Sequence, residues 1–501
     1  MLGWKRNERG QRRFLGLVIV VLVVGLFSGI MAALQGDRTK RIGQMEERFL
    51  TKERILLERQ RKPMRQQNQL PIWAIPVSGK MMLMHENYIF IIGQTITKIN
   101  KQSGEVIWSI TSPVGVKDAC LTLQGDLCIT GTIHTGFDTN WITVKIDGIN
   151  GNIIWQSIHS GSGVYTWDEA SAISVDKQGN VYVTGHIEDV IGYGFFAYRM
   201  EYMSVVKYDG TNGILIWEKR EGGWRATGGS DIIIDKQGFV YALGYLGIEW
   251  AGVGGAILRA IILIKYDPVT GEVIWRLQRR VYDVVSNFID LDDFGNLIIL
   301  GTLWTHSWHE GSNPAGYYLC KIDPQSSQII WEQSVLQWKL YPIVMKVDIN
   351  GNLFIIGNYR FSNIYNIYKF NSVNGENIWI LTLDGENKFN SLTVDEDQYV
   401  YVVGSSKEAR LNYDYTIIKL NAVNGEIMDY IFYDDGQDEE ANYLVIDDDK
   451  SMYVTGNTKT LKYIQKYYNR PPVLTKVESP PDKGVATGQP WFRMQAEDPD
   501  G

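Results

Sequence analysis

Three side chains that could bind a metal lie close together in the sequence. His306, His309 and Glu310 fall within five residues, and imidazole and carboxylate groups at short spacing are common zinc ligands. The other histidines are spread over several repeats, so no second cluster completes a ligand set. We therefore interpret these groups as scattered polar loop residues and predict neither a metal nor a cofactor.

Aromatic residues gather in the same stretches of the chain. Exposed aromatic side chains suit sugar rings or the centre of a protein interface. A local core beneath long loops is the alternative interpretation of the same residues. The candidate binding residues are Tyr193, Phe195, Phe196, Tyr198, Trp250, Trp304, Trp308, His306 and His309.

Nucleophilic catalysis has no recognisable motif in this sequence. The chain contains no G-x-S-x-G, no H-E-x-x-H and no cysteine near a motif histidine. Paired carboxylates such as Asp168 and Glu169 leave a lyase or glycosidase site open as an alternative. We predict no catalytic residue and regard a binding protein as the better interpretation.

A repeated pattern must position these residues. The stretch "KYDPVTGEVIW", residues 265–275, is typical of a strand, a tight turn and a second strand. A strand ending in glycine, such as "NVYVTG", alternates with it and occurs eight times at spacings of 38 to 59 residues. Repeats of this size predict propeller blades. Tryptophans at the repeated place are predicted to fasten neighbouring blades: Trp73, Trp108, Trp155, Trp217, Trp275, Trp331 and Trp379.

Each repeat is interpreted as four antiparallel strands, which form one blade. After the eighth glycine-ended strand the chain has a third strand but no tryptophan strand. Residues 71–77 are expected to supply it and close blade 8, because open edge strands invite aggregation. Residues 71–469 are thus predicted to be all-β, an eight-bladed propeller of four-stranded antiparallel blades. Blade 7 has Asp429 at the tryptophan place, so that contact is expected to be absent or replaced by Tyr430.

A membrane helix is predicted at residues 14–34. This stretch has 21 residues without a charge, and at about 1.5 Å per residue it spans a hydrocarbon core of about 30 Å. The preceding residues 1–13 are basic, which favours a cytoplasmic N terminus. The run is longer than the apolar part of a cleaved signal peptide. We expect a single-pass membrane protein whose propeller is extracytoplasmic, at the cell surface or in the periplasm.

The segments on either side of the propeller have their own character. Residues 35–70 are predicted to be a charged helical stalk, with pairing of stalks from two copies as the alternative. Residues 1–70 carry net charge +9, which leaves −17 for the rest and argues against nucleic acid as a partner of the folded part. Residues 470–501 resemble the opening strands of an immunoglobulin-like or cadherin-like module, here expected to be truncated.

The three cysteines do not form a disulfide framework. Cys120 and Cys128 are predicted to lie on neighbouring strands of one hairpin. An offset of eight residues in a short hairpin does not by itself align their Cβ atoms. Cys320 stands alone in the sequence. A disulfide is therefore not expected.

One face of the predicted ring should hold most of the irregular sequence. In a propeller blade the second-to-third hairpins and the inter-blade loops share one face. Insertions at 186–203, 245–260 and 302–316 fall there in three consecutive blades. Loops held by a rigid scaffold are where binding usually occurs, so this face is the predicted interaction surface.

The stretch "DPVTGEVIW" resembles the tryptophan-docking pattern of the quinoprotein (PQQ) propellers, and "DEASAISVDKQGNVYVTG" resembles a microbial β-propeller repeat. The resemblance implies an eight-bladed fold for residues 71–468. Quinoprotein alcohol dehydrogenases use PQQ, calcium, a catalytic aspartate and adjacent cysteines, and this chain has no adjacent cysteines. We expect a membrane-anchored module that binds or scaffolds a cell-surface or envelope protein or a glycan. A degenerate quinoprotein-like dehydrogenase or a carbohydrate-active enzyme is the alternative.

Overall fold

The computed structural model describes residues 70–464 with short gaps, and the strands at 473–478 and 493–497. The chain divides into two compact units, Met1–Gln66 and Gln67–Gly501, and the described residues belong to the second. Among them, no helix has the length and apolarity needed to cross a membrane. The predicted membrane helix and nearly all of the predicted stalk lie outside the described residues. The gaps are 164, 193–197, 224–225, 251–256, 282, 308–310, 337–339, 360–361, 408–411 and 435.

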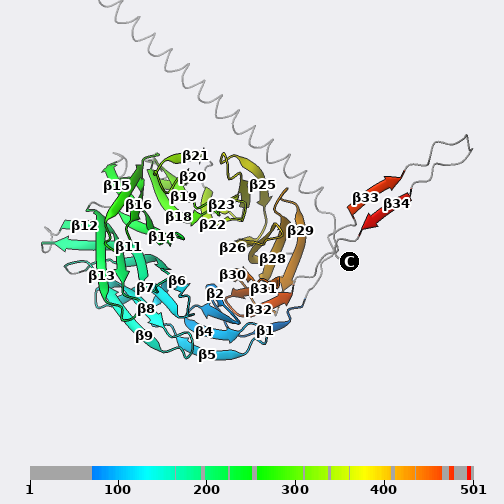
Figure 1. The fold of residues 1–501 in the computed structure, drawn as a ribbon, viewed down its shortest axis with the longest axis horizontal. Coiled ribbons are helices and arrows are strands. Elements are labelled where there is room, and N and C mark those ends of the chain that lie inside the picture. Colours follow the sequence, from blue (N-terminus) through cyan, green and yellow to red (C-terminus); the bar gives the residue numbers. More distant parts are fainter. Residues whose placement is uncertain are drawn as a thin grey trace, which may run out of the picture. The chain divides into compact units, whose positions relative to one another are not determined.

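Eight four-stranded antiparallel sheets form a ring (Figure 1). Blade 1 contains β2 (Met81–His85), β3 (Tyr88–Ile92), β4 (Thr95–Asn100) and β5 (Val106–Thr111). Blade 2 contains β6 (Gly115–Leu121), β7 (Leu127–Thr135), β8 (Asp138–Ile146) and β9 (Ile153–His159). Blade 3 contains β10 (Glu169–Val175), β11 (Val181–Ile191), β12 (Tyr198–Tyr208) and β13 (Leu215–Gly222). Blade 4 contains β14 (Gly228–Ile234), β15 (Val240–Trp250), β16 (Ile257–Tyr266) and β17 (Val273–Arg279).

The second half of the ring repeats this order. Blade 5 contains β18 (Asp283–Leu291), β19 (Leu297–Ser307), β20 (Gly311–Ile322) and β21 (Ile329–Leu336). Blade 6 contains β22 (Leu340–Val347), β23 (Leu353–Tyr359), β24 (Tyr365–Phe370) and β25 (Asn377–Leu383). Blade 7 contains β26 (Asn387–Val394), β27 (Tyr399–Ser406), β28 (Asp414–Asn421) and β29 (Ile427–Tyr433). A separate antiparallel pair, β33 (Val473–Glu478) and β34 (Arg493–Glu497), follows the ring in sequence.

Blade 8 is assembled from both ends of the propeller sequence. Its three inner strands are β30 (Ala441–Ile446), β31 (Ser451–Gly456) and β32 (Thr460–Ile464), and its outer strand is β1 (Trp73–Ile75). Trp73 pairs with Lys462, and Ile75 pairs with Thr460. Figure 1 shows the blue β1 beside the orange-red β32. The ring is therefore closed by hydrogen bonds between residues far apart in sequence.

The glycine that ends the second strand of a blade is required by a bulge in the first strand. In blade 2 the pairing of β6 with β7 shifts between Val116 and Asp118, opposite Gly131. A Cβ atom on Gly131 would lie 2.1 Å from the carbonyl oxygen of Gly115. Blades 3 to 8 have a bulge in the same register. In blades 2, 3, 4, 7 and 8 the glycine therefore marks a close approach of two backbones, whereas in blade 6 a Cβ on Gly357 would meet the side chain of Leu340.

The hydrophobic core lies between adjacent sheets. Phe90 and Ile92 of blade 1, for example, pack in one buried cluster with Leu127 and Ile129 of blade 2. Because the strands are buried on both faces, the sequence of each second strand is almost continuously apolar. Each blade therefore depends on its two neighbours for the burial of its side chains.

A tryptophan and a lysine from one blade meet at a single carbonyl of the next blade. In blade 2, Trp155 Nε1 and Lys145 Nζ both donate to the carbonyl oxygen of Gly210 in blade 3, at 3.1 and 2.9 Å. The two side chains are directly opposite each other on β9 and β8. The same paired donation joins blades 1 to 7 in sequence. From blade 8, Trp73 donates to the carbonyl of Gln102 and Lys462 to its side chain.

The lysine of this pair was missed by the sequence analysis, although it stands ten residues before the tryptophan in each complete repeat. Lys265 is 3% exposed, and burial lowers its pKa. In two blades an aspartate of the first-to-second turn forms an ion pair with this buried lysine. Asp126 lies 3.2 Å from Lys145, and Asp292 lies 2.8 Å from Lys321. Buried charges need such partners.

The junction between blades 7 and 8 lacks the tryptophan because its docking place is absent. Elsewhere the indole packs on the third-to-fourth turn of the next blade. Blade 8 has no such turn, since β32 and β1 are not consecutive in the chain. Asp429 occupies the tryptophan place, opposite Lys419. Of the two expected outcomes, loss of the contact agrees with this topology. Tyr430 does not take the place of the tryptophan, because it lies on the other face of β29 and packs in the cluster shared by blades 6 and 7.

We expect Gly213→Ala to destabilise the ring by about 2–4 kcal/mol. Gly213 has φ +73°, and an added Cβ would lie 2.6 Å from Cε3 of Trp155. Urea unfolding followed by circular dichroism measures the change. Gly136→Ala is the matched control, with φ +68° and open space around the new Cβ, and should cost only about 1 kcal/mol. Equal effects of the two variants would contradict a role for the tryptophan contact.

Candidate functional site

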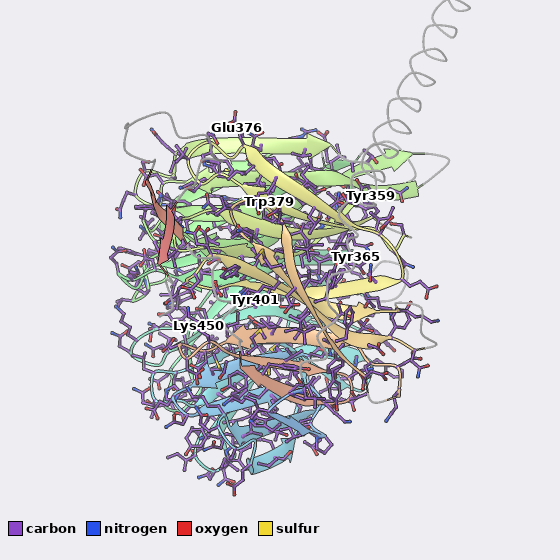
Figure 2. All side chains as sticks on the ribbon, turned by 90° about the vertical axis from the view of Figure 1, so that its right-hand side faces the viewer. Tyr359, Tyr365, Glu376, Trp379, Tyr401 and Lys450 are labelled. Atoms are coloured by element: carbon purple, nitrogen blue, oxygen red, sulfur yellow. The ribbon has the colours of Figure 1, made fainter. Side chains whose placement is uncertain are left out.

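The two faces of the ring are built differently. Figure 2 views the ring from its edge, with Lys450 of a first-to-second turn on the left and Tyr359 and Tyr365, beside a second-to-third hairpin, on the right. The turns on the Lys450 side are short in every described blade. The hairpin side also holds the inter-blade connections, so it carries the less repetitive sequence.

The insertions predicted as loops on this face are largely extensions of hairpin strands. In blade 3, β11 and β12 pair from Val181 with Tyr208 out to Ile191 with Tyr198. The outer strand β13 pairs only with residues Tyr202 to Tyr208 of β12. Blades 4 and 5 have similarly long hairpins. These residues form strands instead of loops because cross-strand hydrogen bonds supply partners for their backbone N–H and C=O groups beyond the body of the blade.

Of the predicted binding residues, Tyr198 and Trp304 have described side chains. Tyr198 is exposed at the start of β12. Trp304 is partly buried in β19, with the Arg259 guanidinium 5.6 Å from its ring. Trp250 and His306 end up in β15 and β19. Outside the described residues lie Tyr193, Phe195, Phe196, Trp308 and His309.

A patch of exposed aromatic side chains lies on the hairpin face of blades 2 and 3. It consists of Phe137, Tyr165, Trp167 and Tyr198, with Ile191 beside Tyr198, and the exposed fractions run from 52% to 84%. The rings of Phe137 and Tyr165 have centroids 5.4 Å apart. We call this surface the blade 2–3 patch. Of these residues, only Tyr198 was predicted from the sequence. The others could have been found from an aromatic residue at a hairpin tip, "TGFD", together with those in an inter-blade connection, "GVYTWDE".

Backbone pairing holds the patch in place. The connection between blades 2 and 3 forms a parallel bridge in which Trp167 pairs with Thr139 of β8. Thr139 N donates to the carbonyl of Thr166 at 3.1 Å, and Asp168 N donates to the carbonyl of Thr139 at 2.8 Å. Tyr165 adopts φ +60°, a conformation uncommon outside glycine. The connection is thus fixed so that its aromatic rings face solvent.

Buried carboxylates beneath the patch are fully engaged in structure. Asp168 is completely buried and accepts hydrogen bonds from the backbone of Glu188 and Gly161, at 2.7 and 2.8 Å. Burial raises its pKa. Glu188 accepts from the backbone of Trp167 at 3.0 Å and pairs with Arg199. Arg199 also donates to the carbonyl of Tyr165 at 3.0 Å.

The two buried carboxylates are not available for proton transfer. A general acid or base must be free to exchange a proton with a substrate, whereas Asp168 and Glu188 are occupied by backbone donors and by Arg199. Within the described ranges, no group of three or more His, Cys, Asp or Glu side chains is arranged to hold a metal ion. The rigid exposed rings are the feature that can contact a partner.

A second candidate region is the centre of the ring. Asp118 of β6 and Asp231 of β14 each accept a hydrogen bond from the first strand of the following blade, at Ile173 and Ile289, at 2.9 and 3.0 Å. Burial raises the pKa of Asp118 to about 6. Burial, opposed by the backbone donor and reinforced by the charge of Asp118, raises the pKa of Asp231 to about 7. These carboxylates join neighbouring inner strands, so we assign them a structural role.

The protein class follows from this geometry: an eight-bladed β-propeller with tryptophan-fastened blades and an exposed patch on its hairpin face. Residues 138–428 match the family described as outer membrane protein assembly factor BamB. The match covers more than half of the chain, and the chain belongs to this family. The resemblance to PQQ-type propellers predicted from the repeats is therefore confirmed.

The chain is also similar to solved structures, of which the Dos1 propeller supports the same fold. The chain is similar to BamB from Moraxella catarrhalis, with 12% identity, a TM-score of 0.47, and coverage of 79% of this chain and 99% of that one. The Dos1 propeller gives 9% identity, a TM-score of 0.50, and coverage of 79% and 95%. Hydrazine synthase of Kuenenia stuttgartiensis gives 13% identity, a TM-score of 0.39, and coverage of 68% of this chain and 95% of that one. No curated protein matches the sequence.

We expect the pH dependence of stability to change in Asp231→Asn. A carboxyl pKa of about 7 in the folded protein, against 3.8 ordinarily, means that the folded state holds a proton that the unfolded state releases. Its stabilising contribution is therefore complete below the ordinary pKa and is lost as pH rises to neutrality. The variant should remove a fall of about 4 kcal/mol over this range, because each unit of pKa difference corresponds to about 1.4 kcal/mol.

Urea midpoints of wild type and variant across this pH range measure the difference, because carboxylates other than the coupled Asp118 affect both proteins equally. Asp293→Asn removes an exposed turn carboxylate and is the charge control. A parallel pair of curves for wild type and Asp231→Asn would contradict the raised pKa.

Proposed function

We propose that this protein is a scaffold propeller that binds a protein partner through the blade 2–3 patch. The observation that carries the proposal is a set of exposed aromatic rings fixed by backbone pairing on one face. Tyrosine and tryptophan dominate the energetic centres of protein interfaces. A rigid platform also loses little conformational entropy when a partner binds.

Family membership supports a protein partner. The name of the family concerns the assembly of outer membrane proteins, so a membrane or envelope protein is the partner class that we propose. The predicted helix at 14–34 fits this setting: it would anchor the chain with its N terminus in the cytoplasm and the propeller outside the membrane. The glycan-binding alternative uses the same rings. For the enzyme alternatives the carboxylate beside the patch is Glu169, which is 41% exposed and accepts a hydrogen bond from the Trp167 indole at 3.3 Å.

Site-specific cross-linking tests the proposal. A photo-reactive phenylalanine analogue at Phe137 is expected to cross-link one defined protein in membranes of the host cell, identified by mass spectrometry. Phe294 is the matched control, since it is also an exposed phenylalanine but lies in a first-to-second turn on the opposite face. The same products from both positions would contradict a patch-specific partner.

The purified partner then provides an affinity measurement. Trp167→Ala should raise the Kd at least about tenfold, because loss of a central interface tryptophan removes 2 kcal/mol or more. Val269→Ala on the turn face is the control and should leave the Kd unchanged. Binding of the full chain to glycans, with no change in protein binding upon Trp167→Ala, would favour the glycan alternative. Circular dichroism verifies that each variant is folded.

A further inference from the structure

Two cysteines of blade 2 stand directly opposite each other. Cys120 of β6 pairs with Cys128 of β7 in the antiparallel register. Residues opposite each other in an antiparallel pair have their side chains on the same face of the sheet. Both thiols belong to one cluster between blades 2 and 3, in which Cys120 packs against the buried Cys128. The offset of eight residues therefore does align these side chains.

The hydrogen-bond pattern fixes the kind of pair that they form. Thr122 N donates to the carbonyl of Asp126 at 2.9 Å, which makes Thr122 and Asp126 a hydrogen-bonded pair. Such pairs alternate with non-hydrogen-bonded pairs along an antiparallel ladder. Cys120 and Cys128 lie two positions further on, so they are again a hydrogen-bonded pair, whose Cα atoms stand about 5.5 Å apart.

This spacing permits a disulfide but strains it. A Cα separation of about 5.5 Å is typical of disulfides, whereas the Cβ atoms of opposed residues lie about 4.5–5.5 Å apart against about 3.8 Å in a relaxed disulfide. Strained disulfides are more easily reduced. The pair therefore has the geometry of a reversible bond.

We propose that Cys120 and Cys128 are a redox-sensitive dithiol that a small-molecule or protein disulfide oxidises to a cross-strand disulfide. Cys120 is partly exposed and Cys128 is buried, so the oxidant reaches Cys120 first. Cys320 is not part of this pair, because it is buried in a different cluster, between blades 4 and 5.

The chemistry proceeds by two thiol–disulfide exchanges. The Cys120 thiolate attacks the disulfide of oxidised glutathione, forms a mixed disulfide and releases one glutathione thiolate. The Cys128 thiolate then attacks Sγ of Cys120 and releases the second glutathione. One cysteine disulfide forms, one glutathione disulfide is reduced to two thiols, and the two cysteine protons pass to these thiols.

The surroundings of Cys120 affect the rate. A hydrogen bond with Cys128, then burial, and then the nearby charges of Cys128 and Asp118 hold the pKa of the Cys120 thiol well above its ordinary value. The thiolate is the attacking species, so oxidation is expected to be slow at neutral pH and faster in mildly alkaline solution.

The test uses the full chain in detergent, incubated with oxidised glutathione at mildly alkaline pH. We expect the intact mass to fall by two hydrogen atoms and the number of thiols that react with iodoacetamide after unfolding to fall from three to one. Peptide mapping should join Cys120 to Cys128. Subsequent titration with reduced glutathione should break the bond, as expected for a strained disulfide.

Variants separate the outcomes. Cys128→Ala should stop at a glutathione adduct on Cys120, whereas Cys320→Ala should behave as wild type apart from its own missing thiol. Three free thiols after oxidation, a persistent adduct on the wild-type chain, or a disulfide to a second copy would each overturn the proposal. A Cys120–Cys128 bond that resists reduced glutathione would overturn the reversible character.

Discussion

The shared carbonyl between adjacent blades is the contact on which the ring depends. At Gly210 the indole N–H of Trp155 and the ammonium of Lys145 converge on one oxygen, and the indole ring covers the turn that presents it. A charge-assisted hydrogen bond is stronger than a neutral one, and burial within the blade junction excludes water. The repeated motif is therefore a fastener between blades.

This fastener explains the irregular seventh blade. A tryptophan is useful only where the next blade presents a third-to-fourth turn, and blade 8 takes its outer strand β1 from the start of the propeller. The substitution of tryptophan by Asp429 and the closure of the ring by Trp73 are two consequences of one topology. Apolar packing between blades 7 and 8 nevertheless continues, through residues such as Tyr401 and Leu444.

A ring held in this way leaves its hairpin face free to vary in sequence. The stability of the blades comes from inter-sheet packing and from the turn-face fasteners, so the hairpins and connections can vary. In blades 2 and 3 this freedom places Phe137, Tyr165 and Trp167 in solvent, above the buried Asp168 and Glu188 that order the backbone. The resulting patch is aromatic, and its backbone is held by the Trp167–Thr139 bridge and by hydrogen bonds to Asp168 and Glu188.

The sequence alone determined the blade count and the fastening tryptophans, because both repeat along the chain and arise from local turn and strand chemistry. It also placed Trp73 in the last blade by homology with Trp108. Only the tertiary structure decided which aromatic rings share a surface, since Phe137 and Tyr165 meet through a connection that crosses between blades. The alignment of Cys120 with Cys128 was likewise decided by strand register, which depends on hydrogen bonding that composition and spacing do not specify.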